Sequence, residues 1–483
     1  MLFNLSKNST SSFQNKLFSN SSWGIIAHAS QTILTTLFFV ILAREYSTND
    51  FASYLIATVI YQLCAAFATL GLSQWFIREL KSDSDRSNIV NKFLKVQVYS
   101  GFVFYLVNLV FAYYLYDEKF IFILALLFGV NIVFDNLINA VKCLNIADFE
   151  QKKTLILLTA EAFLKFICAC ILFVYPFSII NLAIMLIIIR FITLNLFLTF
   201  GSSNVINIKK LWNYKLPWDE AWLLIKTNWP FLIISGAAMI NWRFASIIIS
   251  KTLTSADVAI YEISYKIFYV AQIIPIIIST TIFPELIRIY NEGNFKKLRS
   301  FYKQMQSYYF LFGLFAFTFI FSFSNLLIPF IFGDSYANTS VYTKQMFLTI
   351  LVFPTAFLQS NMLISMKLEK LDMWLNVISL LINLTLCLVG LYFFKSLTSI
   401  NLSIFFAFLV FLILQDIILI KRKVTNLKST LENYLKGLLA VCTYVVFSYY
   451  FNPFLLFFSF WIIALLFRAR LNFNYLPNIT KHI

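Results

Sequence analysis

The sequence predicts an all-α protein that crosses a membrane many times. Hydrophobic residues make up 60% of the 483 residues, charged residues make up 12%, and 56 residues are Phe. Soluble domains carry roughly a quarter charged residues, so this composition lies far outside their range. The apolar residues form long runs separated by short charged segments, which is the pattern of transmembrane helices.

A helix needs about 20 apolar residues to cross the hydrocarbon layer, and by this measure the chain contains about fourteen spans. Their approximate limits are 22–43, 52–77, 93–116, 119–141, 154–175, 178–200, 227–250, 258–287, 305–332, 341–366, 372–394, 399–420, 431–451 and 453–467. The first span is too long, and too closely followed by others, for a cleaved signal peptide. We therefore expect the chain to be inserted whole.

The positions of Lys and Arg test this topology independently. If both termini are cytoplasmic, 28 of the 38 cationic residues fall in segments on the cytoplasmic side. The outer loops hold Arg44, Lys119, Lys251, Lys344 and Lys395. The positive-inside rule predicts this asymmetry. The net charge of +16 is thus a signal of topology, and we expect no binding of nucleic acid.

Two stretches of the chain, 207 residues apart, resemble each other. Arg44–Tyr54 aligns with Lys251–Tyr261, so that a cation, a Ser/Thr pair, an Asp, an Ala and a Tyr fall in register. Ser47 with Asp50, and the equivalent Thr254 pair, predict two capped helix starts. Chance similarity is the alternative, since short turns of this composition are common. The interpretation we adopt is a six-helix unit used twice.

This repeat predicts the domain organisation. Six spans return the chain to the same side of the membrane, so the two copies would be parallel. The expected parts are an N-terminal six-helix bundle over 1–200, a cytoplasmic linker over 201–226, a C-terminal six-helix bundle over 227–423, and two additional helices with a cytoplasmic tail over 424–483.

Several absences from the sequence exclude common functions. The six Cys lack the spacing of metal ligands, there are two His, and no Gly-rich phosphate loop occurs among 11 Gly. The longest connection, the linker over 201–226, is shorter than any catalytic or nucleotide-hydrolysing domain. We therefore expect a transporter rather than an enzyme, with no metal and no cofactor.

Four cationic residues lie deep inside predicted spans. Ionisable groups in hydrocarbon cost roughly 2.5–3.5 kcal/mol each, so they usually face a cavity or a partner. All four lie near the middle of their helices: Lys165, Arg190, Arg243 and Lys266. Cations at one depth suggest a binding site for an anionic substrate. Arg190 and Arg243 have no acidic neighbour on their own helices, which makes them the stronger candidates.

Acidic residues share these helices. Glu161 precedes Lys165 by one turn and Glu262 precedes Lys266 by one turn, so each pair lies on one helix face. Such pairs can be ion pairs that only hold helices together. Alternatively, an anionic substrate can bind the cation in place of the buried carboxylate, and the carboxylate can then take up H⁺ or Na⁺. With Asp135 as a third deep acid, these residues are the candidates for ion coupling.

The order of motifs along the chain also resembles a known family. The residues that carry the likeness are LAREYSTNDFASY at 42–54, GLSQWFIREL at 71–80, VAIYEISYKI at 258–267, FPEL at 283–286 and FGDSYANTS at 332–340. In sequence and spacing they resemble the polysaccharide flippases of the multidrug/oligosaccharidyl-lipid/polysaccharide exporter superfamily. One departure is the absence of an acid after Arg243, where such proteins often carry Arg-x-Asp.

The resemblance implies two six-helix bundles around a central cavity that opens to one side at a time. The implied substrate is an undecaprenyl-diphosphate-linked oligosaccharide, flipped across the bacterial inner membrane for O-antigen, capsule or similar surface polysaccharide. Its implied partners are a coupling ion, H⁺ or Na⁺, and other membrane proteins of polysaccharide assembly. Two alternatives remain open: a multidrug or cation exporter of the same superfamily, and a non-transporting scaffold of an assembly complex.

Two further charges are candidates for a gate. The 207-residue offset places Arg78, at the cytoplasmic end of the second span, on Glu285 at the corresponding end of the eighth. Opposite charges at equivalent positions can form a cytoplasmic salt bridge when the cavity faces outward. The alternative is two solvated charges at the membrane interface.

Overall fold

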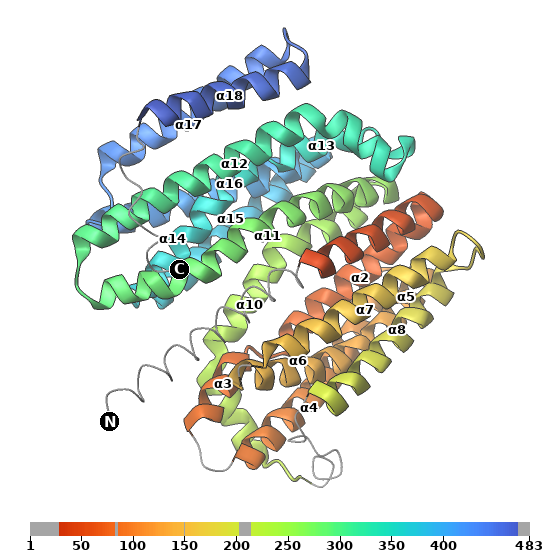
Figure 1. Ribbon diagram of the computed structural model, residues 1–483. Coiled ribbons are helices and arrows are strands. Elements are labelled where there is room, and N and C mark those ends of the chain that lie inside the picture. Colours follow the sequence, from red (N-terminus) through yellow and green to blue (C-terminus); the bar gives the residue numbers. More distant parts are fainter. Residues whose placement is uncertain (1–28, 83–85, 149, 202–213, 472–483) are drawn as a thin grey trace, which may run out of the picture. The chain divides into compact units, whose positions relative to one another are not determined.

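The computed structural model describes residues 29–82, 86–148, 150–201 and 214–471 (Figure 1). In these ranges the regular structure is helical and contains no strand. Ten of the helices described are long and apolar enough to cross a membrane. The chain is therefore an all-α, multi-pass membrane protein, as its composition predicts.

The first half of the chain begins with a helical segment over 29–45. The helices that follow are α2 (Thr48–Ala68), α3 (Ser73–Ser82), α4 (Arg86–Leu115), α5 (Lys119–Gly129), α6 (Asn131–Ala147), α7 (Gln151–Ile171), α8 (Ile179–Leu196), the π-helical turn η1 (Phe197–Gly201) and α10 (Trp218–Thr252).

The second half continues in the same way. Its elements are α11 (Ser255–Asn291), α12 (Phe295–Phe332), the short 3₁₀ turn η2 (Asp334–Tyr336), α13 (Thr339–Met346), the 3₁₀ turn η3 (Thr349–Leu351), α14 (Phe353–Ser365), α15 (Glu369–Phe394), α16 (Leu397–Lys421), α17 (Leu427–Ser448) and α18 (Pro453–Leu471).

A helix occurs at each predicted span, but the membrane-crossing criterion is met at ten of them. The predicted spans outside those ten are 22–43, 227–250, 431–451 and 453–467. The total of about fourteen crossings therefore stays a prediction.

The predicted uninterrupted span over 52–77 is wrong. The chain breaks between α2 and α3, where Leu70 has φ 52° and Gly71 has φ 64°. Both angles are left-handed, a conformation that ends a helix and that a side chain with a Cβ disfavours. The apolar composition of this stretch concealed the break, because hydropathy reports burial and not backbone continuity.

Side chains of neighbouring helices satisfy the carbonyl groups freed by this break. Gln97 Nε2 donates to the carbonyl of Thr69 at 3.1 Å. The carbonyl of Ala68 accepts from Ser100 Oγ at 2.7 Å and from Asn136 Nδ2 at 3.1 Å. These donors are buried on α4 and α6. Since no water reaches hydrocarbon, a helix end at this depth requires such partners.

Both predicted helix caps are confirmed. At the start of α2, Ser47 Oγ accepts from the backbone N–H of Asp50 at 3.2 Å. At the start of α11, Thr254 Oγ1 accepts from the N–H of Asp257 at 3.2 Å, and Asp257 accepts in return from the backbone N–H of Thr254. The same local chemistry thus begins both helices. Whether they belong to a duplicated unit stays a prediction.

Contacts divide the chain into two compact units. Unit 1 comprises Met1–Lys266 with Leu380–Ile400, and unit 2 comprises Ile267–Ser379 with Asn401–Ile483. These divisions fall at other residues than the domain limits predicted from the repeat. In unit 1, α10 packs against α2. A Cβ on Gly236 of α10 would lie 2.4 Å from the ring of Phe67, so only glycine allows this approach.

In unit 2, aromatic side chains join α17 and α18 to α12. The rings of Phe323 and Phe457 lie 5.2 Å apart, edge to face. Trp461 Nε1 donates to Thr318 Oγ1 at 3.0 Å, which satisfies the polar edge of a ring otherwise surrounded by apolar groups. Figure 1 shows these two C-terminal helices (blue) alongside α12.

We expect Asn136→Leu to lower stability by about 1–3 kcal/mol, because the buried Asn136 amide donates to the carbonyls of both Ala68 and Gln97 and these hydrogen bonds are lost. Thermal unfolding of the purified protein in detergent measures the change. Asn195→Leu is the matched control, since Asn195 is exposed and bonds only within its own helix. Equal melting temperatures for Asn136→Leu and wild type would contradict the role given to Asn136.

Candidate functional site

Helices α2, α6, α7 and α8 bring charged side chains together inside unit 1. Because α6, α7 and α8 pack against one another, residues far apart in sequence meet at one depth. We call this group the first charge cluster; it consists of Tyr61, Asp135, Glu161, Lys165 and Arg190.

Arg190 is the centre of the first charge cluster. Its Nε donates to Asp135 Oδ1 at 2.6 Å, and its terminal nitrogens bond to Asp135 and Glu161. Lys165 Nζ lies 2.6 Å from Glu161 Oε1. The Tyr61 hydroxyl also donates to Asp135. The side chain of Glu161 is 5% exposed and that of Arg190 is 18% exposed, so these ion pairs are shielded from water.

Arg190 has no acidic neighbour on its own helix, as expected from the sequence, but it forms ion pairs across helices. Its acidic partners, Asp135 and Glu161, come from two other helices, which a search of its own helix cannot reveal. The predicted intrahelical pair of Glu161 with Lys165 is confirmed. Two cations and two acids therefore compensate each other here.

Lys142 adds a cation to this environment. It lies on α6, seven residues or two turns after Asp135. The two-turn spacing from Asp135 was the signal that placed it on the same helix face.

A second charge cluster lies between α10 and α11, also in unit 1. Arg243 Nη1 donates to Glu262 Oε2 at 3.0 Å, and Ser246 donates to the same carboxylate. The Arg243 guanidinium lies 4.7 Å from the centre of the Tyr265 ring, and Lys266 Nζ lies 5.6 Å from the ring of Phe39. Aromatic faces attract both cations.

The second charge cluster departs from prediction in two ways. Arg243 was taken as unpaired, yet it pairs with Glu262 across helices. Consequently Glu262 does not form an ion pair with Lys266 in the part of the chain described; its carboxylate is held by Arg243 and Ser246 instead. Two cations face one acid, so this cluster carries an excess positive charge.

Asn383 connects α15 to α10 within unit 1. Its Nδ2 donates to the side-chain oxygen of Asn241 at 2.7 Å and to the carbonyl of Asn241 at 3.1 Å. Asn241 precedes Arg243 by two residues. This contact fixes the backbone of α10 just before the second charge cluster.

The structure describes the side chain of one of the two predicted gate residues, Glu285. The side chain of Arg78 lies outside the described part of the structure. Glu285 accepts from Arg288 Nε at 2.7 Å and from Nη2 at 2.6 Å, and these hydrogen bonds hold the pKa of Glu285 below its ordinary value. A bridge to Arg78 would require Glu285 to leave Arg288.

Sequence reasoning missed two buried acids in unit 2, Asp372 and Asp416. Each lies within a helix long enough to span the membrane. The signal was present, because Asp416 stands inside the apolar run of α16 after Gln415. Within the ranges described, no group of three or more His, Cys, Asp or Glu residues is placed to hold a metal ion.

Comparisons with known proteins give a family and a fold. A family model described as "Polysaccharide biosynthesis protein" matches residues 41–341. Among curated proteins, none matches this chain. The lipid II flippase MurJ, in an inward closed conformation, has a similar structure, with a TM-score of 0.73 and 15% identity over 92% of this chain and 99% of its own.

Two other solved structures share the fold. A multidrug resistance MATE family transporter of the MOP superfamily, facing inward, has a TM-score of 0.68 and 12% identity over 82% of this chain and 96% of its own. A MOP superfamily transporter from Pyrococcus furiosus has a TM-score of 0.59 and 12% identity over 83% of this chain and 95% of its own. These proteins are transporters and flippases, not enzymes.

We expect Arg190→Gln to lower stability by about 3–5 kcal/mol, because the buried carboxylate of Glu161 and the partly buried carboxylate of Asp135 lose a shared cation. Adding Asp135→Asn should recover part of this loss, since it removes one of the unpaired charges. Thermal unfolding in detergent compares the single and double variants. Arg288→Gln, at an exposed ion pair, is the control and should change stability by less than about 0.5 kcal/mol. A double variant less stable than Arg190→Gln would refute the pairing.

Proposed function

Because the chain belongs to the polysaccharide biosynthesis protein family, we propose that it flips a lipid-linked oligosaccharide across the bacterial inner membrane. The cargo would be a repeat unit on undecaprenyl diphosphate, and the product a surface polysaccharide such as O-antigen or capsule. The family match over residues 41–341 carries this proposal, and the likeness to the lipid II flippase supports it. Both termini would be cytoplasmic, and other membrane proteins of polysaccharide assembly would be partners.

The diphosphate would bind the buried cations of unit 1, which are Lys165, Arg190, Arg243 and Lys266. Arginine is suited to this role, because its planar fork donates two parallel hydrogen bonds to phosphate oxygens. The second charge cluster supports the proposal most directly, since two cations face one acid there. A diphosphate would add negative charge where positive charge is in excess.

In the first charge cluster, a diphosphate must compete with carboxylates already in place. Arg190 is bound to Asp135 and Glu161, so an anion that takes Arg190 leaves these acids without their partner. An unpaired buried carboxylate favours uptake of H⁺ or Na⁺. Arrival of the cargo would thereby be linked to binding of an ion.

Glu161 is the proposed main coupling residue, because its two oxygens bond to different cations, Lys165 and Arg190. Asp135 would assist it. Glu262 would play the equivalent part for Arg243. On the cytoplasmic side, Arg78 and Glu285 would form a gate if Glu285 exchanges its partner Arg288 for Arg78 during the cycle.

The alternative of a multidrug exporter draws on the likeness to the MATE transporter. Such an exporter binds organic cations and would benefit from an excess of acids. The excess cation in the second charge cluster favours an anionic cargo instead. A scaffold without transport activity would tolerate loss of all these charges, so substitution of the cations separates the three functions.

We expect Arg243→Ala to abolish display of the surface polysaccharide while the protein remains inserted. Arg243→Lys should restore part of the display, since it keeps the charge but not the paired hydrogen bonds. Complementation of a strain lacking the gene, with staining of the glycan and immunoblotting of membranes, measures both. Arg422→Ala, at an exposed arginine outside the charge clusters and the gate, is the control. Wild-type display in Arg243→Ala would reject the proposed site.

We expect Glu161→Gln to retain binding of the lipid-linked cargo but to remove the dependence of transport on an ion gradient. Glutamine keeps the size and the hydrogen-bond acceptor while it cannot take up a proton. Flipping in proteoliposomes, with and without an imposed pH or Na⁺ gradient, measures this. If gradient dependence persists in Glu161→Gln and disappears in Asp135→Asn, Asp135 is the coupling residue.

A further inference from the structure

Unit 2 contains a buried polar network around two acids that the proposed transport site does not use. Asp372 on α15 is 8% exposed and Asp416 on α16 is 3% exposed. We call this the Asp372–Asp416 network; its members are Tyr302, Gln359, Ser360, Asp372, Asn376, Gln415, Asp416 and Tyr434.

Asp416 is held by donors from two other helices. Gln359 Nε2 on α14 donates to Asp416 Oδ1 at 2.7 Å, and the Tyr434 hydroxyl on α17 donates to Oδ2. Gln359 Nε2 also donates to the hydroxyl of Tyr302 on α12, at 3.0 Å. One carboxyl group therefore links α14 and α17, and reaches α12 through Gln359.

Asp372 occupies an adjacent position in the same network. Ser360 Oγ donates to its Oδ1 at 2.9 Å, and Gln415 Nε2 donates to the same oxygen at 3.2 Å. Asn376 Nδ2 lies 3.2 Å from Oδ2. Because Ser360 follows Gln359 and Gln415 precedes Asp416, the surroundings of the two acids are continuous.

These acids differ from those of unit 1 in their partners. Asp135, Glu161 and Glu262 each pair with an arginine. Among the residues that the structure describes, Asp372 and Asp416 form no ion pair. Burying a carboxylate without a positive partner is costly. The network therefore lacks a positive charge.

The network also lacks a hydrogen-bond donor. The side-chain oxygens of Gln359 and Gln415 are fully buried and accept no hydrogen bond from any described residue. Each belongs to an amide whose nitrogen already faces one of the two acids. A proton on the carboxyl group would supply both missing elements, because it neutralises the acid and, once the amide turns, donates to its oxygen.

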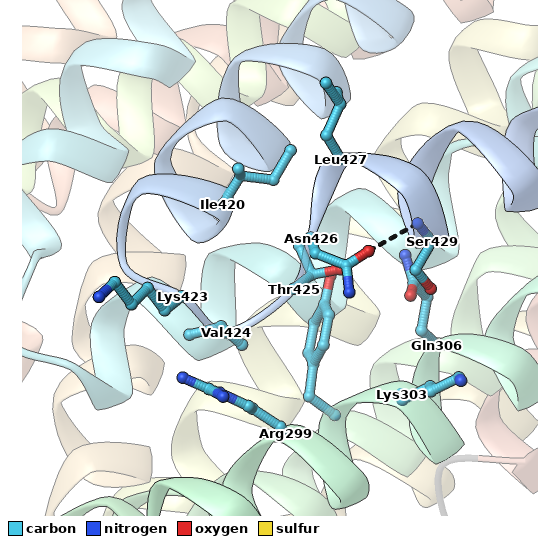
Figure 2. A pocket seen from close by; sticks show the side chains of 11 residues that line it. Arg299, Lys303, Gln306, Ile420, Lys423, Val424, Thr425, Asn426, Leu427 and Ser429 are labelled. Carbon is cyan, nitrogen blue, oxygen red and sulfur yellow. Dashed lines mark hydrogen bonds between the residues drawn. The ribbon is translucent and has the colours of Figure 1, made fainter.

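A pocket connects this network to the surface of unit 2. It has a volume of about 470 Å³, and Tyr302 forms part of its wall together with Gln306, Arg299, Lys303 and Lys423 (Figure 2). The hydroxyl of Tyr302 contacts Gln359, which contacts Asp416. Three cationic side chains and no carboxylate line the pocket, so it offers no anionic ligand to Na⁺, whereas passage of a proton requires only water.

We propose that Asp416, with Asp372 beside it, is a proton-binding site of unit 2 that exchanges with this pocket. Tyr302 and Gln359 separate the pocket from Asp416, so exchange requires these side chains to move aside. A hydronium ion that then reaches Asp416 transfers its proton to a carboxylate oxygen and leaves as water. Because Tyr434 of α17 donates a hydrogen bond to the same carboxyl group, protonation of Asp416 changes the contact between α16 and α17. Binding of a proton here does not depend on the proposed flippase function. The use of that proton to drive transport rests on the proposed function.

Infrared spectroscopy of the purified protein in lipid nanodiscs tests this directly. Protonated carboxyl groups absorb in a separate band, and buried ones absorb at its high-frequency side. As the pH is changed, we expect a high-frequency component that is present in wild type and absent in Asp416→Asn. Glu432→Gln, an exposed acid two residues from Tyr434 on α17, is the matched control and should retain the component.

Two further measurements keep the test decisive. Tyr434→Phe should shift the frequency of the component, because it removes one hydrogen bond from the carboxyl group and leaves the acid in place. An unchanged component in both Asp416→Asn and Asp372→Asn would overturn the proposal, as would its displacement by Na⁺ but not by choline. No cargo is needed, so a failure here leaves the proposed function untouched, and loss of flipping leaves this result untouched.

Discussion

Compensation of charge inside apolar helices is the constraint on which unit 1 depends. Arg190 reaches Asp135 on one helix and Glu161 on another, so a single guanidinium fixes the rotation of α6 and α7 about α8. Apolar packing alone would allow many such rotations, because the lipid-facing and protein-facing surfaces of these helices are both hydrophobic. A charge that must find its partner at one depth and one orientation removes this freedom.

The same constraint bears on the proposed binding of a charged substrate. A site with bare arginines would be costly in the absence of cargo. Under the proposed function, the carboxylates that pair with the arginines would stabilise the empty protein, and phosphate oxygens of similar charge and geometry would replace them. Stability without substrate and affinity for substrate would then be set by the same residues.

Structural features that depend on residues close in sequence could be predicted, whereas features that depend on packing between helices could not. Ser47 and Thr254 could be identified as helix caps because the groups they bind are three residues away. The membrane helices could be placed because each is a long apolar run. The break at Leu70 could not be found in this way, since the donors that stabilise it come from α4 and α6. For the same reason the acidic partners of Arg190, which lie on α6 and α7, could not be identified. Asp416 was overlooked because the residues around it in α16 are apolar.

The way in which α2 ends has a consequence for variation among related sequences. Its last carbonyls are satisfied by Gln97, Ser100 and Asn136, so the helix end is encoded on other helices and not within α2. A change at one of these three positions alters what the others must supply. They are therefore expected to covary as a group.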